Sequence, residues 1–234
     1  MEPDLGTPPS GRTGNIDNAR PLPAGERPDG RLRKGAETAE RILNVAEELF
    51  AEKGYAGTTL RDIATRAKIR NPSIYNHFDG KENLYLAVLE RGLRPMWELF
   101  QQLAIRANQS DELDLQVVDG LMDLLAEHPN LPNLMQHEAL SGGERLHARL
   151  AEWVQPMFDA AAGIVTHSPG NRWREGQTTL LVLALYNMIA GYFTMAPLYK
   201  VIRGEDLLEE EMRDKQRQLL HEIIGLLFSE ENKT

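Results

Sequence analysis

The sequence predicts an all-α protein, in which a three-helix N-terminal domain with a helix-turn-helix precedes a domain of six longer helices. Apolar residues recur at spacings of three and four along most of the chain after residue 36, and no segment alternates convincingly at period two. Two short segments between residues 58 and 79 also have the capping residues and tight connection of a helix-turn-helix. We therefore expect a tail at 1–33 and domains at 34–80 and 81–234.

The first 33 residues contain six prolines and five glycines and almost no apolar periodicity. Such a segment buries too little apolar surface to offset the entropy of ordering it, so we predict a disordered tail. At its end, Arg31, Arg33 and Lys34 form a basic stretch beside the first helix. This stretch could lie along a DNA minor groove, although an unstructured leader is the simpler interpretation.

The first helix is expected to begin at Glu37 and to end near Gly54. Its apolar stripe consists of Ile42, Leu43, Ala46, Leu49 and Phe50. Gly54 suits the position after a helix end, because glycine adopts a positive φ at little cost.

The second helix is expected to begin after Thr59 and to end near residues 68–70. With Thr59 as N-cap, Asp62 falls at the third helical position, which is the arrangement of a capping box. A third short helix should follow, with Asn71 as its N-cap and Pro72 as its first residue. Its polar outer face then makes the pair a helix-turn-helix.

The segment AEELFAEKGYAGTTLRDIATRAKIRNPSIYNHFDGKENLYLAVL resembles the DNA-binding domain of the TetR family of bacterial transcriptional regulators, over roughly residues 37–90. The spacing of Gly54-Tyr55, the TT-L-x-D-I-A stretch from Thr58, Tyr75-x-x-Phe78 and Lys81-Glu82-x-Leu84 carries the resemblance. It implies three N-terminal helices and about six more, with the third helix in the DNA major groove. It implies phosphate contacts from Thr59, Tyr75 and Lys81, and makes the following residues candidates for base and backbone contacts: Arg70, Asn71, Ser73, Asn76 and His77.

The sequence departs from the family in the turn, where Lys68-Ile69-Arg70 replaces the usual Gly-Val-Ser. A lysine with a left-handed backbone would cost about 1 kcal/mol there. We expect Arg70 to contact phosphate, while a bidentate contact to a guanine edge stays open. Lys81 begins a helix, where a cation opposes the helix dipole, and a nearby phosphate would explain it.

The second domain should contain helices at 81–107, 111–127, 131–140, 143–167, 172–200 and 206–229, with Pro95 and Pro156 kinking or dividing two of them. The helix from about Gly176 is apolar nearly all round and must be covered on every side. We interpret the last two helices as a homodimer interface, as the resemblance also implies; an intramolecular core is the alternative. A two-fold dimer would bind a palindromic operator in double-stranded DNA.

The second domain is also expected to bind a small effector, apolar or aromatic in character. Large aromatic side chains and methionines suit such a cavity, although most of them could be ordinary core. The excess of acidic residues in 81–234, 23 against 14 basic, leaves a lipophilic cation open as the ligand. The candidate contacts are Trp97, Phe100, Met122, Met135, His137, Trp153, Tyr186 and Tyr192.

Other classes of protein fit less well. His137-Glu138 begins like an HExxH zinc motif, but Ser141 stands where the second histidine is required, so we expect no enzyme, metal or cofactor. The chain has no cysteine and no secretory h-region, and we interpret the apolar run Leu180–Ala196 as a buried helix of a cytoplasmic protein. A helical interaction protein that has lost DNA binding, or an activator of the same fold, remains an alternative.

Overall fold

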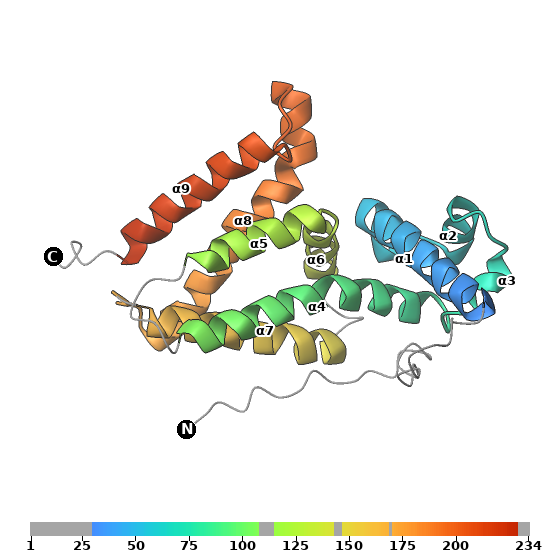
Figure 1. The fold of residues 1–234 in the computed structure, drawn as a ribbon, viewed down its shortest axis with the longest axis horizontal. Coiled ribbons are helices and arrows are strands. Elements are labelled where there is room, and N and C mark those ends of the chain that lie inside the picture. Colours follow the sequence, from blue (N-terminus) through green and yellow to red (C-terminus); the bar gives the residue numbers. More distant parts are fainter. Residues whose placement is uncertain (1–29, 108–114, 143–146, 169, 229–234) are drawn as a thin grey trace. The chain divides into compact units, whose positions relative to one another are not determined.

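The computed structural model describes residues 30–107, 115–142, 147–168 and 170–228, without the side chains of 30–32, 104, 107, 147–153 and 175. Every regular element in these ranges is a helix, which confirms the all-α prediction (Figure 1). The helices are α1 (Gly30–Gly57), α2 (Leu60–Arg66), α3 (Asn71–Ile74), α4 (Lys81–Ala107), α5 (Gln116–Glu127), α6 (Leu131–Leu140), α7 (His147–His167), α8 (Glu175–Arg203) and α9 (Glu210–Phe228).

The first helix begins earlier than the sequence suggested. It starts at Gly30 instead of Glu37, so the end of the predicted tail is helical, and Arg33 forms an exposed ion pair with Glu37 one turn later (3.4 Å). The side chain of Arg31 and the tail before Gly30 lie outside the described residues. Pro95 and Pro156 do not divide α4 and α7, each of which runs through its proline as one helix.

Contacts divide the described residues into two compact units. The N-terminal unit comprises residues 30–92 and 133–142, and the bundle unit comprises the remaining parts of α4 and α6 with α5, α7, α8 and α9. The sequence had suggested a boundary at residue 80. Long helices hide such a boundary because their periodicity continues through it, whereas packing partners change along their length.

An aromatic cluster forms the middle of the N-terminal unit. Tyr85 of α4 lies edge-on to Phe50 of α1, with ring centroids 4.7 Å apart, and both rings contact Tyr55. From α6, the buried carboxyl of Glu138 accepts a hydrogen bond from the Tyr85 hydroxyl (2.5 Å). The ring of His137 packs against Gly54, and its Nε2 lies 3.1 Å from the carbonyl oxygen of Ala51. The second half of α6 is therefore part of the wall that supports α1.

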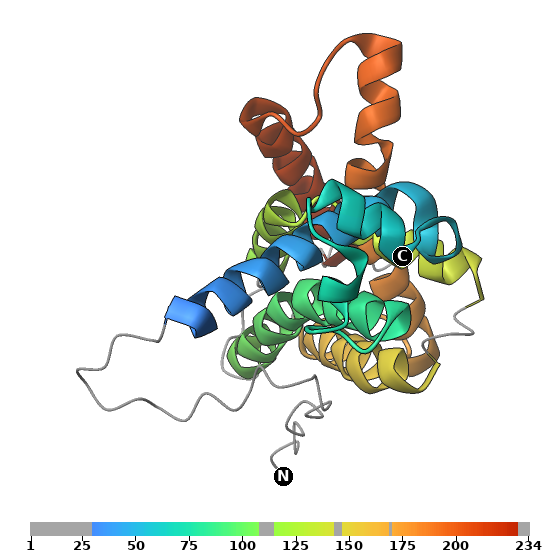
Figure 2. The same ribbon diagram turned by 90° about the vertical axis from the view of Figure 1, so that its right-hand side faces the viewer.

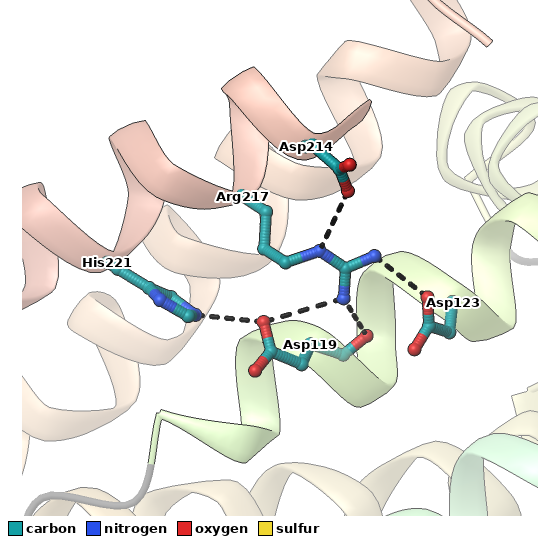
Figure 3. Close-up of polar contacts among 5 residues, drawn as sticks. All are labelled: Asp119, Asp123, Asp214, Arg217 and His221. Atoms are coloured by element: carbon teal, nitrogen blue, oxygen red, sulfur yellow. Dashed lines mark hydrogen bonds and ion pairs between the residues drawn. The ribbon is translucent and has the colours of Figure 1, made fainter. Parts of the chain in front are cut away.

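In the bundle unit α8 packs on α5 and α7, and α9 packs on α5. Figure 3 shows the polar side of the α5–α9 contact, where the Arg217 guanidinium donates to Asp123 Oδ1 (2.8 Å) and lies 3.5 Å from Asp119 Oδ1. His221 Nε2 lies 2.9 Å from the same Asp119 oxygen, and Asp214 is 3.9 Å from Arg217 Nε. This cluster fixes the register of α9 on α5.

Helix α8 leaves much of its apolar surface uncovered. Its span Gly176–Arg203 is long and apolar enough to cross a membrane by length and composition, yet only 22% of its most apolar window is buried. In both views its C-terminal turns project away from α5 and α7 before the chain returns as α9 (Figures 1 and 2). The expectation that this helix is covered on every side is therefore not met within one chain.

Candidate DNA-binding surface

The end of α1 is fixed by the buried side chain of Thr58, a role that the sequence pattern around it did not reveal. The hydroxyl of Thr58, fully buried, lies within hydrogen-bonding distance of the carbonyl oxygens of Leu49 (3.0 Å) and Gly54 (2.9 Å). Gly54 has φ 68° and ψ 174°, so its predicted positive φ is confirmed. In the sequence, a threonine immediately before the N-cap residue Thr59 was the available signal.

The predicted capping box of α2 is confirmed. The backbone N–H of Asp62 donates to the Thr59 hydroxyl oxygen (3.1 Å), and the backbone N–H of Thr59 donates to Asp62 Oδ2 (3.1 Å). The Thr59 hydroxyl also donates to that oxygen (2.6 Å). These hydrogen bonds lower the pKa of the Asp62 carboxyl below its ordinary value. The capping box keeps Thr59 exposed at the start of α2.

In the turn between α2 and α3, one residue has the left-handed backbone conformation that the family pattern suggested for this turn. Lys68 has φ 55° and is the one described non-glycine residue with a positive φ. Ile69 N–H closes the turn by donating to the carbonyl oxygen of Ala64 (3.0 Å). The side chains of Lys68 and Arg70 are exposed and form no ion pair with the described residues, so both cations are available to a polyanion.

The predicted cap of α3 is wrong. Arg70, not Asn71, is the N-cap residue, and its side chain makes no capping hydrogen bond. Asn71 is already helical, and Pro72 follows in the first turn, where its missing N–H costs nothing because that N–H would have no partner within the helix. The first turn closes instead through Ser73 N–H, which donates to the Arg70 carbonyl oxygen (2.8 Å).

Residues 71–78, called the recognition segment below, consist of the very short helix α3 followed by a turn. Ile74 and Phe78 are buried and anchor it, whereas Tyr75 is 57% exposed. Asn71 and Asn76 are also exposed, and Ser73 and His77 are half-buried. Of the predicted contact residues, only Asn71 and Ser73 lie within α3, because α3 ends at Ile74 and the next three residues form a turn.

The side chain of Lys81 contacts an aromatic ring within the N-terminal unit. Its Nζ lies 4.1 Å from the centroid of the Tyr55 ring, a cation–π geometry. This contact offers a second reason for a cation at the start of α4, and it holds the ammonium group beside the α1–α2 turn. Arg66, in contrast, is engaged by Glu48 (3.0 Å) and Glu52 (3.4 Å).

The predicted effector contacts are distributed over both units. Trp97, Phe100 and Met122 are buried in the bundle unit, and the Trp97 indole N–H has no acceptor among the described residues. Burial raises the pKa of the Tyr186 phenol, and raises that of Tyr192 to about 12; the Tyr192 hydroxyl donates to the Leu207 carbonyl oxygen. Met135 and His137 belong to the N-terminal unit. The side chain of Trp153 lies outside the described residues.

The bundle unit also contains a pocket of about 360 Å³ that includes none of these predicted contacts. It is lined by Asp123, Ala126, Glu127, Pro129, Leu208 and Arg213. In the described part of the chain, no group of three histidine, aspartate or glutamate side chains could hold a metal ion.

The N-terminal segment is similar to known bacterial regulators. Residues 42–88 match the family model described as bacterial regulatory proteins, tetR family. The repressor NicS of Pseudomonas putida is 26% identical over 135 residues, which cover 58% of this chain and 63% of NicS. The negative regulator IcaR of the icaADBC biofilm operon of Staphylococcus aureus is 50% identical over 46 residues, which cover 20% of this chain and 25% of IcaR. The chain thus matches less than two thirds of the length of either relative.

Solved structures with the same fold extend this likeness to most of the chain. A transcriptional regulator from Aquifex aeolicus superposes with a TM-score of 0.57 at 21% identity, covering 82% of this chain and 99% of that one. The regulator FadR from Bacillus subtilis, solved in complex with stearoyl-CoA, gives a TM-score of 0.54 at 18% identity, covering 77% and 96%. At such identities the likeness concerns the fold.

Proposed function

Because the chain belongs to the TetR family of bacterial transcriptional regulators, which are not enzymes, we propose that it is a cytoplasmic repressor that binds a palindromic operator as a homodimer. The observation that carries this proposal is the recognition segment itself. Buried Ile74 and Phe78 hold it in place, while Tyr75 and the flanking polar side chains face solvent.

In this proposal the protein contacts DNA through two sets of residues, one for phosphates and one for bases. Thr59, Tyr75 and Lys81 would contact phosphates, which positions the protein without reading sequence. Arg70, Asn71, Ser73, Asn76 and His77 would contact base edges or the backbone near them. The cations of Lys68 and Arg70, which are exposed and form no ion pair with the described residues, support this assignment, because a protein with net charge −9 needs local positive charge where it meets DNA.

The dimer would form through α8 and α9. Both helices leave large apolar side chains exposed, among them Leu180 (65%) and Leu226 (66%). Such surface is costly to leave in water and is typical of an interface between subunits. A two-fold axis would then present two recognition segments to the two halves of a palindrome.

The effector would be a small molecule with an apolar or aromatic body and at least one hydrogen-bond acceptor. The Trp97 indole N–H is buried without an acceptor among the described residues, so a ligand that supplies one would satisfy this donor. The acyl chain of the ligand bound to FadR supports an apolar effector for this fold. Effector binding would favour a dimer whose two DNA-binding units are wrongly spaced for the operator.

Selection of bound duplexes from a random DNA pool, followed by sequencing, tests the proposal. A palindromic consensus, lost when Tyr75 is replaced by alanine, is the expected result. No enrichment, even after the protein has been unfolded and refolded to strip bound ligand, would instead favour a helical interaction protein without DNA binding. A reporter gene behind the selected site then distinguishes repression from activation, and a ligand that leaves operator affinity unchanged would contradict effector-controlled release.

A further inference from the structure

The pocket of about 360 Å³ in the bundle unit contains charged side chains that neither the DNA contacts nor the predicted effector contacts include. It lies where the end of α5 and the turn after it meet the α8–α9 loop and the first turn of α9. Pockets for small molecules generally measure about 300–1,000 Å³, so this one suits a small ligand. Its apolar lining consists of Ala126, Pro129 and Leu208, and its charged lining of Asp123, Glu127 and Arg213.

The cation of the pocket, Arg213, lacks a partner among the described residues. Its Nε is buried without a hydrogen-bond acceptor, and its guanidinium forms no ion pair with those residues. Burial raises the pKa of the nearby Tyr192 phenol and the charge of Arg213 opposes that rise, but the Tyr192 hydroxyl donates to the Leu207 carbonyl oxygen. A buried guanidinium N–H without an acceptor is costly, and a carboxylate from a ligand satisfies it with a charge-assisted hydrogen bond.

The two carboxylates of the pocket differ in their partners. Asp123 is already engaged, because the Arg217 guanidinium donates to its Oδ1 (2.8 Å; Figure 3). Glu127, one turn later on α5, is exposed and forms neither a hydrogen bond nor an ion pair with any described residue, Arg213 included. The pocket therefore presents one positive and one negative charge that are not compensated and do not pair with each other.

The two walls of the pocket are held by hydrogen bonds in which these two charged groups take no part. In the turn after α5, the Leu131 N–H donates to the carbonyl oxygen of His128 (3.0 Å). In the α8–α9 loop, the Leu208 N–H donates to Asp206 Oδ1 (3.0 Å), and Lys200 Nζ donates to Asp206 Oδ2 (2.6 Å). A site whose walls are already ordered loses less entropy when a ligand binds.

We propose that this pocket binds a small zwitterion, namely an α-amino acid with an apolar side chain. The ligand carboxylate accepts hydrogen bonds from Arg213, its ammonium group pairs with Glu127, and its side chain packs against Leu208. A simple carboxylic acid would satisfy Arg213 but place a second negative charge near Glu127, and a simple amine would leave Arg213 without an acceptor. The site shares no residue with the proposed DNA and effector contacts, so it depends on neither.

Ligand-observed saturation-transfer NMR with the full-length protein tests the class of ligand. The probes are L-alanine, L-valine, L-leucine, L-methionine and L-phenylalanine, which share the zwitterion and differ in the size of the apolar side chain. At least one of them should bind with a dissociation constant of about 1 mM or lower, measured by isothermal titration calorimetry. Binding of none of the five would overturn the proposal.

Two analogues of the amino acid that binds most tightly test whether both of its charges are recognised. Each analogue keeps the side chain, but one lacks the amino group and the other lacks the carboxylate. Each should bind at least about tenfold more weakly, because it loses one charge-assisted contact. If the carboxylic acid binds as tightly as the amino acid, the pocket is an anion site and the proposed pairing with Glu127 is overturned.

Four variants test whether the ligand occupies this pocket. Arg213→Gln and Glu127→Gln should each raise the dissociation constant at least about tenfold. Lys215→Gln and Glu98→Gln remove the same charges from exposed positions outside the pocket, and should leave that constant within about twofold. A ligand that binds Arg213→Gln as tightly as the parent lies elsewhere, which would overturn the assignment. Since no DNA is present in these measurements, their failure leaves the proposed repressor function standing.

Discussion

The hydroxyl of Tyr85 on α4 donates a hydrogen bond to the buried carboxyl of Glu138 on α6, a residue 53 positions later in the chain. The other oxygen of that carboxyl, Oε2, has no hydrogen-bond partner among the described residues. Tyr85 is therefore the one side chain seen to satisfy a carboxyl that is only 3% exposed.

Replacing Tyr85 by phenylalanine should destabilise the protein by about 1–3 kcal/mol, because it leaves the Glu138 carboxyl buried without a donor. The free energy of unfolding in urea, at a fixed protein concentration, measures the effect. The double variant Tyr85→Phe/Glu138→Leu should recover part of the loss, since both polar partners are then removed. A double variant less stable than the sum of the two single changes would contradict this account.

Gly54→Ala should lower stability by at least about 1 kcal/mol, because an L-residue is strained at positive φ. In addition, the new Cβ would lie 3.2 Å from the His137 ring. Gly35→Ala on the same helix is the matched control: its Cβ would meet nothing, so helix propensity should make it neutral or stabilising. The melting temperature should therefore fall for Gly54→Ala and stay level or rise for Gly35→Ala.

The capping box predicts a specific pH dependence. Since hydrogen bonds from Thr59 lower the folded-state pKa of Asp62, ionised Asp62 stabilises the fold above its unfolded-state pKa, and this stabilisation is lost as pH falls through the lowered folded-state value. Asp62→Ala should be less stable than the parent at pH 7, and the difference should shrink under acid. Chemical unfolding at pH 7 and near pH 3 tests this, and a difference that does not depend on pH would count against it.

Arg70→Ala should weaken operator binding evenly across sequences and reduce the slope of log affinity against log salt by about one, as expected for a phosphate contact. Lys215→Ala on α9 changes the net charge equally and should leave the slope unchanged. If affinity for one base pair relaxes instead, by about 1–3 kcal/mol, then Arg70 contacts a guanine edge.

The sequence by itself determined the features that depend on a few neighbouring residues. The capping box of Thr59 and Asp62, the positive φ of Gly54 and the boundaries of α4 and α6 all follow from hydrogen bonds and steric limits within one or two helical turns. The cap of α3 was predicted wrongly even at this range, because Asn71 and Pro72 fit either of two starting positions.

Only the tertiary structure decided where distant residues meet. His137, expected beside an effector, lies against Ala51, 86 positions earlier, and Glu138 lies against Tyr85. The sequence also could not predict which face of α8 is exposed. That helix is apolar nearly all round, so its periodicity does not indicate which side the rest of the chain covers. Such pairings depend on the sum of packing over many residues, which no local pattern records.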